Sequence, residues 1–285
     1  MNATPSGLAN SEILRLRNGR QETVLDQIVI EEPLEIRLGY TDPRKGRVHR
    51  SISITMRTPG DDIALALGFL YAESIIRAPD AVASIDCGDN VVRIELQDGA
   101  RFDPLRLERH FYTTSSCGVC GKASLEVLDN AGFAPLLTES PVLSPELLYR
   151  LPGQLRAQQP LFRASGGNHG VALFDADGTL LDVAEDVGRH NAMDKLVGRR
   201  LQEGRLPLHD CGILLSGRAS FELLQKALAA GCPFVAAVGA PSSLAVELAQ
   251  EFHITLIGFL SEHGCNIYHA AGRLVPSSSP PPATA

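Results

Sequence analysis

Two cysteines three positions apart, Cys117 and Cys120, stand in the run TTSSCGVCGK over residues 113–122. Thiols at this spacing can approach each other on a turn or at the start of a helix. A helix N-terminus, or the cation of Lys122, favours the thiolate over the thiol. Because the thiolate is the nucleophile, Cys117 and Cys120 are the candidate catalytic residues. Their glycine, serine and threonine neighbours are typical of an accessible loop.

This spacing is compatible with three kinds of chemistry. A zinc site needs about four ligands, but the cluster His263-Gly264-Cys265 lies far away in the sequence. A thioredoxin-like dithiol belongs early in a βαβ unit, whereas a long β-rich segment precedes this pair. The third chemistry is a sulfur relay, in which one cysteine holds sulfur as a persulfide and the other assists its release.

Three of the other cysteines are better explained as buried residues of the protein core than as reactive thiols. Cys87, Cys211 and Cys232 lie in or beside apolar segments, so we expect them to be core residues. Cys117 and Cys120 fit that interpretation poorly, because their neighbours are polar and small.

Polar residues gather in two runs of the second half, GGNHG over residues 166–170 and EDVGRHN over residues 185–191. A glycine lets backbone approach a ligand closely, and an arginine can grip phosphate oxygens with two hydrogen bonds. The carboxylates could instead serve a helix N-terminus, and a lone histidine often makes a structural hydrogen bond. Because the residues cluster, we expect a binding site that includes Gly167, His169, Arg189, His190 and Arg218.

The amino-acid composition indicates where in the cell the protein is located and which classes of partner it lacks. Apolar residues make up 44% of the 285 residues and charged residues 21%, which is ordinary globular usage. The net charge of −7 gives no overall basic field for nucleic acid. No apolar run reaches the roughly twenty residues of a membrane helix, and no signal peptide is visible. We therefore expect a cytoplasmic protein without membrane or nucleic-acid partners, in which a close cysteine pair is catalytic or metal-binding.

Composition also predicts five segments. They are a flexible arm over residues 1–20, a β-rich N-terminal subdomain over 21–112, a cysteine loop and connector over 113–140, an α/β domain over 141–275, and a disordered tail over 276–285. The tail sequence PSSSPPPATA cannot form a core.

The pattern of apolar residues positions the candidate site residues. In the first half it predicts strands over 24–30, 34–38 and 49–57, a helix over 62–75, and a hairpin over 81–96. In the second half it predicts a hairpin over 171–183, a helix over 190–201, and alternating strands and helices over 212–215, 221–230, 234–238, 244–252 and 254–259. Such short, continuously apolar strands suit a sheet covered on both faces by helices. Arg218 follows a strand end, where open α/β sheets bind ligands.

Five runs of the sequence resemble the formate dehydrogenase accessory sulfurtransferase family. They are residues 56–62, 116–121, 166–169, 185–195 and 216–222. The run EDVGRHNAMDK over residues 185–195 is a specific signature, whereas a C-x-x-C alone would not be. The resemblance spans about residues 22–270 and implies a cytidine-deaminase-like α/β/α second half, a smaller β-rich N-terminal subdomain, and a homodimer.

The resemblance also implies a function. Family members take sulfur from a cysteine desulfurase and deliver it to the molybdenum bis-guanine-dinucleotide cofactor, and this makes formate dehydrogenase active. Cys117 would hold the persulfide and Cys120 would assist. The cofactor is bound as cargo, with GDP expected to bind as a fragment of it. The alternatives are a non-catalytic chaperone that binds this cofactor and a dithiol redox enzyme.

By the same resemblance, one further segment is expected to bind the cofactor within the α/β domain. Its residues are Phe259, Leu260, Ser261, Glu262, His263 and Gly264. The H-x-E and P-C-x-x-C elements of zinc deaminases are missing from the sequence, so a deaminase-like fold would not imply deamination, and we expect no permanent metal.

Overall fold

A computed structural model of the chain describes residues 7–99, 128 and 132–275. The cysteine run over residues 113–122 and the expected tail over 276–285 lie outside these described residues. The chain divides into two compact units. The first comprises described residues of 1–120 together with 159–170 and 184–205, and the second comprises described residues of 121–158, 171–183 and 206–285.

The first unit contains a four-stranded sheet in the order β4-β3-β6-β5. Its strands are β3 (Glu32–Asp42), β4 (Gly46–Arg57), β5 (Val82–Gly88) and β6 (Val91–Leu96). β3 pairs antiparallel with β4 and parallel with β6. One face is apolar and fully buried, with Leu34, Ile36, Leu38, Val92 and Ile94. The structure thus confirms the strands predicted over 34–38 and 49–57 and the hairpin over 81–96, and extends the first two.

Helices α1 (Asp62–Ala72) and α6 (Arg189–Gln202) pack together in this unit. Their backbones meet at glycines. A Cβ on Gly68 would lie 1.9 Å from the carbonyl oxygen of Asp194, and a Cβ on Gly198 would lie 1.8 Å from that of Ala64. The expected domain over 141–275 is therefore wrong as one continuous body, because α6 belongs to the first unit. Two short helices complete the unit, η1 (Pro79–Ala81) and α5 (Pro160–Ser165).

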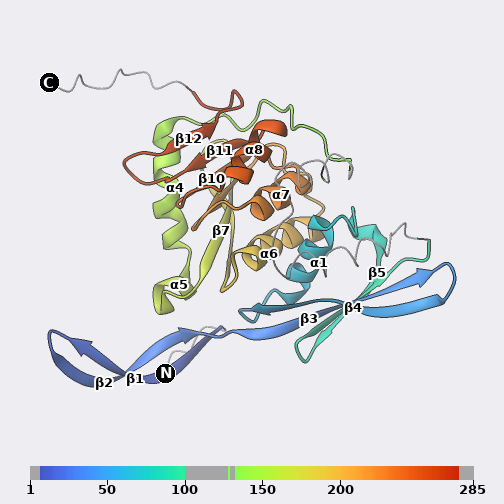
Figure 1. The fold of residues 1–285 in the computed structure, drawn as a ribbon, viewed down its shortest axis with the longest axis horizontal. Coiled ribbons are helices and arrows are strands. Elements are labelled where there is room, and N and C mark those ends of the chain that lie inside the picture. The colour runs from blue at the N-terminus through green and yellow to red at the C-terminus, as the bar shows by residue number, and fades with distance from the viewer. Residues whose placement is uncertain (1–6, 100–127, 129–131, 276–285) are drawn as a thin grey trace. The chain divides into compact units, whose positions relative to one another are not determined.

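The expected arm over residues 1–20 contains a regular strand. β1 (Leu8–Arg17) pairs antiparallel with β2 (Arg20–Val29) over ten residue pairs, and Figure 1 shows this hairpin extending away from β3 and β4. The turn residues Asn18 and Gly19 have φ of 50° and 75°. Two positive φ values in a two-residue turn match the twist of the flanking strands, so an Asn-Gly turn stabilises a hairpin here.

The second unit is built on a six-stranded sheet in the order β12-β11-β10-β9-β7-β8. Its strands are β7 (His169–Phe174), β8 (Leu180–Asp186), β9 (Gly212–Leu215), β10 (Phe234–Ala237), β11 (Thr255–Gly258) and β12 (Asn266–His269). β9, β10 and β11 are parallel, whereas β7 runs antiparallel to β9 and β12 runs antiparallel to β11. The helices are α4 (Pro145–Ala157), α7 (Phe221–Ala229) and α8 (Ser243–Glu251). The predicted alternation of strands and helices over 212–259 is confirmed.

The core of the second unit lies between this sheet and α4. It contains Leu148, Leu151 and Leu155 from α4 and Phe174, Phe234 and Ile257 from the strands. Phe174 and Phe234 meet edge to face, with ring centroids 5.7 Å apart. The α/β class of the chain is thus confirmed, while the likeness to cytidine deaminase stays a prediction. In the described part of the chain, no helix has the length and apolar character needed to cross a bilayer.

Candidate functional site

Three loops meet at one edge of the second unit's sheet. They follow the carboxyl ends of β9, β10 and β11, which lie at the same edge because these strands are parallel. The first loop carries Arg218, the second carries Gly239, and the third is the segment over residues 259–264. This edge is where open α/β sheets bind ligands.

Backbone hydrogen bonds fasten the three loops to one another. Gly239 N donates to Gly217 O at 2.9 Å, and Phe259 N donates to Gly239 O at 3.1 Å. A Cβ on Gly239 would lie 2.9 Å from Arg218 N and from Gly217 O. Only glycine therefore fits at the centre, and the structure brings Arg218 and the 259–264 segment to a common edge.

The 259–264 segment presents a mixture of anchored and exposed residues. Leu260 is buried in the core and donates its N–H to Ala237 O at 3.0 Å. Ser261 closes the loop, since its N–H and its hydroxyl both donate to Gly264 O, at 2.9 and 3.1 Å. Glu262 and His263 are exposed. Phe259 is 51% exposed and has a φ of 52°, so its ring stands out from this edge on a left-handed backbone.

The N-termini of α7 and α8 follow directly from the first two loops. Ser220 is the N-cap of α7, and the Ser242 hydroxyl caps α8 by accepting from Ala245 N at 3.2 Å. Helix N-termini carry partial positive charge, and the exposed guanidinium of Arg218 adds a full one. The arrangement can hold an anionic group such as a phosphate, with Phe259 offering an aromatic face nearby along the same edge.

The other predicted binding residues lie in the first unit. Gly167 N donates to Ser165 Oγ at 3.1 Å, and a Cβ at Gly167 would lie 2.9 Å from Val29 Cγ1. His169 is half-buried at the start of β7, and Arg189 and His190 are half-buried in the first turn of α6. Arg189 Nε is buried without a hydrogen-bond partner among the described residues. A common pocket for these residues and Arg218 stays a prediction.

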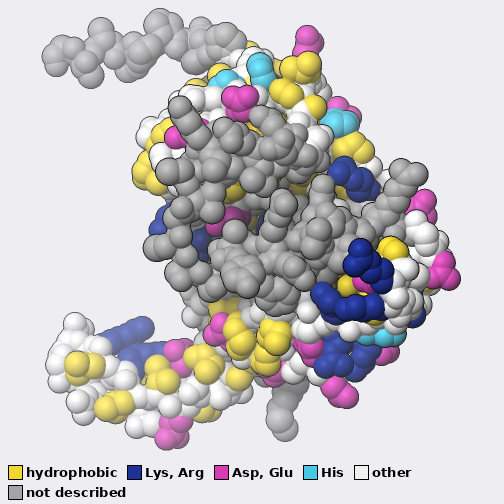
Figure 2. All heavy atoms as spheres, turned by 45° about the vertical axis from the view of Figure 1, so that its right-hand side comes forward, with side chains coloured by type: hydrophobic (Ala, Val, Ile, Leu, Met, Phe, Trp, Pro, Cys, Tyr) yellow, Lys and Arg dark blue, Asp and Glu magenta, His cyan; other side chains and the backbone are white. Residues whose placement is uncertain are grey.

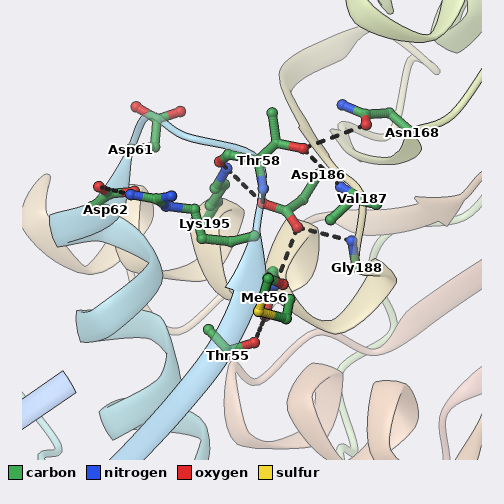
Figure 3. A network of polar contacts seen from close by, with 12 residues as sticks. Thr55, Met56, Thr58, Asp61, Asp62, Asn168, Asp186, Val187, Gly188 and Lys195 are labelled. Atoms are coloured by element: carbon green, nitrogen blue, oxygen red, sulfur yellow. Dashed lines mark hydrogen bonds and ion pairs between the residues drawn. The ribbon is translucent and has the colours of Figure 1, made fainter. Parts of the chain in front are cut away.

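Asp186 is the centre of a buried hydrogen-bond network in the first unit (Figure 3), and its side chain is fully buried. Its Oδ1 accepts from Gly188 N at 2.8 Å and from Asn191 Nδ2 at 3.0 Å. Its Oδ2 accepts from Thr58 N at 3.1 Å and lies 2.7 Å from Lys195 Nζ. With four donors, this carboxylate is fully occupied within the protein and serves the start of α6.

The network extends to the chain segment that follows β4. Lys195 Nζ donates to Thr58 O at 2.8 Å, and Val187 N donates to Thr58 Oγ1 at 3.1 Å. Asn191 Nδ2 also donates to Met56 O at 2.7 Å. These bonds join residues about 130 positions apart in sequence. Much of the signature run 185–195 therefore fixes the N-terminus of α6, and with it the positions of Arg189 and His190.

Glu185 also serves a helix rather than standing free. Its two carboxylate oxygens accept from Leu161 N at 3.0 Å and Phe162 N at 2.8 Å, in the first turn of α5. Burial raises the pKa of the Glu185 carboxyl, while the two N–H groups act in the opposite direction. The interpretation of Glu185 and Asp186 as charges at helix N-termini thus fits the structure. The sequence reasoning did not single out Thr58 and Lys195, although both lie in runs that carry the family resemblance.

Four cysteines lie among the described residues, and they differ in burial. Cys232 is fully buried and donates to Cys211 O at 3.3 Å, and burial raises its pKa to about 12. Cys211 is half-buried, and Cys265 is half-buried with a pKa raised by burial. Cys87 is exposed, so its assignment to the core was wrong. It lies on β5, which is an edge strand of the four-stranded sheet.

Cys87 lines a pocket of about 400 Å³ at the start of α1, together with Asp62 and Arg199. Partial burial and the Asp62 carboxylate raise the pKa of its thiol, so less of it is present as the nucleophilic thiolate. Across residues 7–99, 128 and 132–275, no three His, Cys, Asp or Glu residues gather as a metal site. Cys117 and Cys120 lie outside the described residues and remain the candidate catalytic pair.

Comparisons with known proteins point to one protein family over almost the whole chain. A model of the FdhD/NarQ family matches residues 29–275. The sulfur carrier protein FdhD of Streptomyces coelicolor is 49% identical over 274 residues, which cover 92% of this chain and 94% of the relative. The protein of the same name from Sulfurisphaera tokodaii is 40% identical over 93% of this chain and 98% of its own.

A solved structure shows the same fold. It is described as a putative formate dehydrogenase accessory protein from Desulfotalea psychrophila, and it matches with a TM-score of 0.71. The match covers 94% of this chain and 99% of the other, at 23% sequence identity. At that identity the likeness supports the fold alone.

Proposed function

Since the chain belongs to the FdhD/NarQ family, we propose that it is a sulfur carrier that serves the activation of a formate dehydrogenase. The observation that carries this proposal is the pair Cys117 and Cys120, in a chain whose relatives are named sulfur carriers over more than nine-tenths of both lengths. Among the described cysteines, burial raises the pKa of Cys232 and Cys265, and partial burial with the Asp62 carboxylate raises that of the exposed Cys87. These three thiols therefore carry less thiolate at neutral pH, which leaves Cys117 and Cys120 as the better candidates for the carrier.

The sulfur is carried as a persulfide on Cys117. The Cys117 thiolate attacks the terminal sulfur of a persulfide on a cysteine desulfurase. The sulfur–sulfur bond of the donor breaks, a donor thiolate leaves, and a new sulfur–sulfur bond forms on Cys117. This exchange consumes no oxidant or reductant, and it needs an accessible thiolate.

Release requires two electrons, because the acceptor takes the atom as sulfide. Cys120 supplies them when its thiolate attacks the inner sulfur of the loaded Cys117. The terminal sulfur leaves as sulfide and a Cys117–Cys120 disulfide remains, which a cellular dithiol then reduces. The two cysteines therefore have different roles, and only Cys117 is needed for loading.

The acceptor is the molybdenum bis-guanine-dinucleotide cofactor, which the protein binds as its substrate. Its phosphates and guanine rings call for cations and flat surfaces, and the loop edge of the second unit offers both. Arg218 and the N-termini of α7 and α8 supply positive charge, and Phe259 supplies an exposed ring. GDP is the fragment of the cofactor that should bind at this edge.

Mass spectrometry after incubation with a cysteine desulfurase and cysteine tests the loading step. The wild-type protein should gain the mass of one sulfur atom on the Cys117 peptide, and Cys117→Ala should gain none there. Cys87→Ser is the matched control, because it removes an exposed thiol outside the pair and should load normally. A carrier is excluded if the wild-type peptide binds no sulfur.

The same experiment separates the two alternative functions. A cofactor chaperone would bind GDP but gain no mass, and a dithiol redox enzyme would lose two hydrogens without retaining sulfur. Calorimetry with GDP and ADP tests the acceptor side independently. We expect binding of GDP in preference to ADP, and equal binding of both would contradict a guanine site.

A further inference from the structure

The turn between β3 and β4 concentrates positive charge on a chain that is acidic as a whole. The chain has a net charge of −7, but residues 42–50 contain four cations, Arg44, Lys45, Arg47 and Arg50, against the single carboxylate of Asp42. Figure 1 shows this turn at the end of β3 and β4 that points away from the β1–β2 hairpin. We call residues 42–50 the basic tip.

The backbone of the basic tip is held in one shape by its own turn. β3 and β4 stay paired as far as Asp42 and Gly46, and Gly46 has a φ of 75°, which suits glycine. Asp42 Oδ1 accepts from Arg44 N at 2.8 Å and from Lys45 N at 3.0 Å. The side chains of Arg44 and Lys45 are exposed. The cations are therefore presented on an ordered backbone, which lowers the entropic cost of binding a partner.

Arginines elsewhere on the same sheet are balanced by acids. The ion pairs join Arg37 with Glu35 at 2.8 Å, Arg93 with Asp86 at 3.0 Å, and Arg47 with Glu95. Arg44, Lys45 and Arg50 differ, because no carboxylate among the described residues lies within 4.0 Å of their charged groups. Like charges this close in sequence repel one another. An acidic partner would relieve this repulsion.

The cations surround the basic tip instead of lining one face of the sheet. Arg47 and Arg50 lie three positions apart on β4, so their side chains point to opposite faces of the strand. Arg44 and Lys45 occupy the turn between β3 and β4. Figure 2 shows Lys and Arg side chains gathered at the right of the view, where the right-hand side of Figure 1 has come forward. Such a tip fits a segment or groove that presents carboxylates from more than one side.

We propose that the basic tip binds an acidic segment of a protein partner. A membrane-binding element needs apolar side chains to insert among lipids, and residues 41–50 expose no large apolar side chain. A nucleic acid would extend its phosphates past the turn. It would then meet the carboxylate of Asp98, whose side chain is 92% exposed and accepts from Thr41 Oγ1 at 2.9 Å. An acidic segment can contact the cations without meeting this carboxylate.

Fluorescence anisotropy with a labelled peptide of alternating glutamate and serine tests the site on the full chain. The wild-type protein should bind this peptide, with an affinity that falls as salt is added. Arg44→Glu combined with Lys45→Glu should raise the dissociation constant more than about tenfold, because two attractions become repulsions. Both backbone N–H groups remain in this variant, so the turn on Asp42 is kept.

Arg150→Glu combined with Arg156→Glu is the matched control. Both arginines are exposed on α4, so the variant changes the net charge by the same amount at a different place. Its dissociation constant for the peptide should stay within about threefold of the wild-type value. An equal loss of affinity in the two double variants would show that the peptide responds only to the overall charge, and this result would overturn the proposal.

Two competitors separate a protein partner from other polyanions. A DNA duplex, and vesicles that contain phosphatidylserine, are each added at the same concentration of negative charge as unlabelled peptide. The unlabelled peptide should displace the labelled peptide more effectively than either competitor. Stronger displacement by DNA or by vesicles would overturn the choice of a protein partner. A wild-type protein that does not bind the peptide would overturn the site itself, and neither result depends on the proposed sulfur chemistry.

Discussion

The polar run over residues 185–195 and the loops at the edge of the second unit's sheet use their polar groups in different ways. In the first, Asp186 and Lys195 are buried and bonded to other parts of the protein. In the second, Arg218, Glu262 and His263 are exposed, and the bonds that fasten the loops come mainly from the backbone. A rich set of polar residues in a sequence can thus mark a scaffold or a binding surface, and burial separates the two.

The sharpest way to break this comparison is to remove one partner from the buried ion pair. Lys195→Met leaves the Asp186 carboxylate buried without its cation, so we expect a loss of about 3–5 kcal/mol of stability. Urea unfolding followed by circular dichroism measures it. Arg218→Ala is the control at the exposed edge and should change stability by less than about 0.5 kcal/mol. Equal effects from both variants would contradict the distinction.

A second test concerns the contact that holds α6 in place. Gly68→Ala puts a methyl group where the Asp194 carbonyl oxygen lies, so α1 and α6 must move apart, at a cost of about 1–3 kcal/mol. Gly153→Ala is the control, since it lies inside α4 and its nearest neighbour would be 3.6 Å away. It should stabilise the protein by about 0.5–1 kcal/mol through helix propensity. Opposite signs in thermal unfolding would support the account, and two equal losses would count against it.

Substitutions at the exposed sheet edge should change the affinity for GDP and leave the stability of the fold unchanged. Arg218→Ala removes a guanidinium that can bind phosphate with two hydrogen bonds, so we expect GDP affinity to fall about tenfold. Arg218→Lys should recover only part of it, because an ammonium lacks the planar fork. Calorimetry measures both. Unchanged GDP affinity in Arg218→Ala would place the nucleotide elsewhere.

The smallest expected effect is a pH dependence in the second unit. Burial, with smaller contributions from the nearby charges of His253 and Arg273, lowers the pKa of His269 from its usual value of 6.5. The unfolded chain therefore binds this proton more readily than the folded one, and stability falls as the pH drops through about 6.5. His269→Gln should reduce the fall in melting temperature between pH 7.5 and 5.5, by about 1–2 °C. An identical pH dependence in the variant would contradict this role.

Much of the sheet edge could be predicted from the sequence, because it depends on local signals. Short apolar strands alternate with helices, and parallel strands place Arg218 and residues 259–264 at one edge. The same local reasoning could have found the β1–β2 hairpin from its Asn18-Gly19 turn, but its scattered charges concealed the alternation of apolar residues.

The buried network could not be predicted in this way. Asp186 and Lys195 look like ordinary charged residues of a polar run, and their common partner Thr58 lies 128 positions before Asp186. Only the tertiary packing of α6 in the first unit shows that these charges are buried. Cys87 illustrates the opposite error, since its apolar neighbours suggest the core while its strand lies at a sheet edge.

The most direct test of the account follows one labelled sulfur atom from donor to client. The protein is loaded by a cysteine desulfurase with ³⁵S-cysteine, freed of the donor, and added to formate dehydrogenase that lacks the sulfur. The account predicts that wild-type protein transfers the label and activates the enzyme, that Cys120→Ala loads but transfers poorly, and that Cys117→Ala does neither. Full activation by Cys117→Ala, or label that stays on the wild-type carrier while the enzyme becomes active, would contradict it.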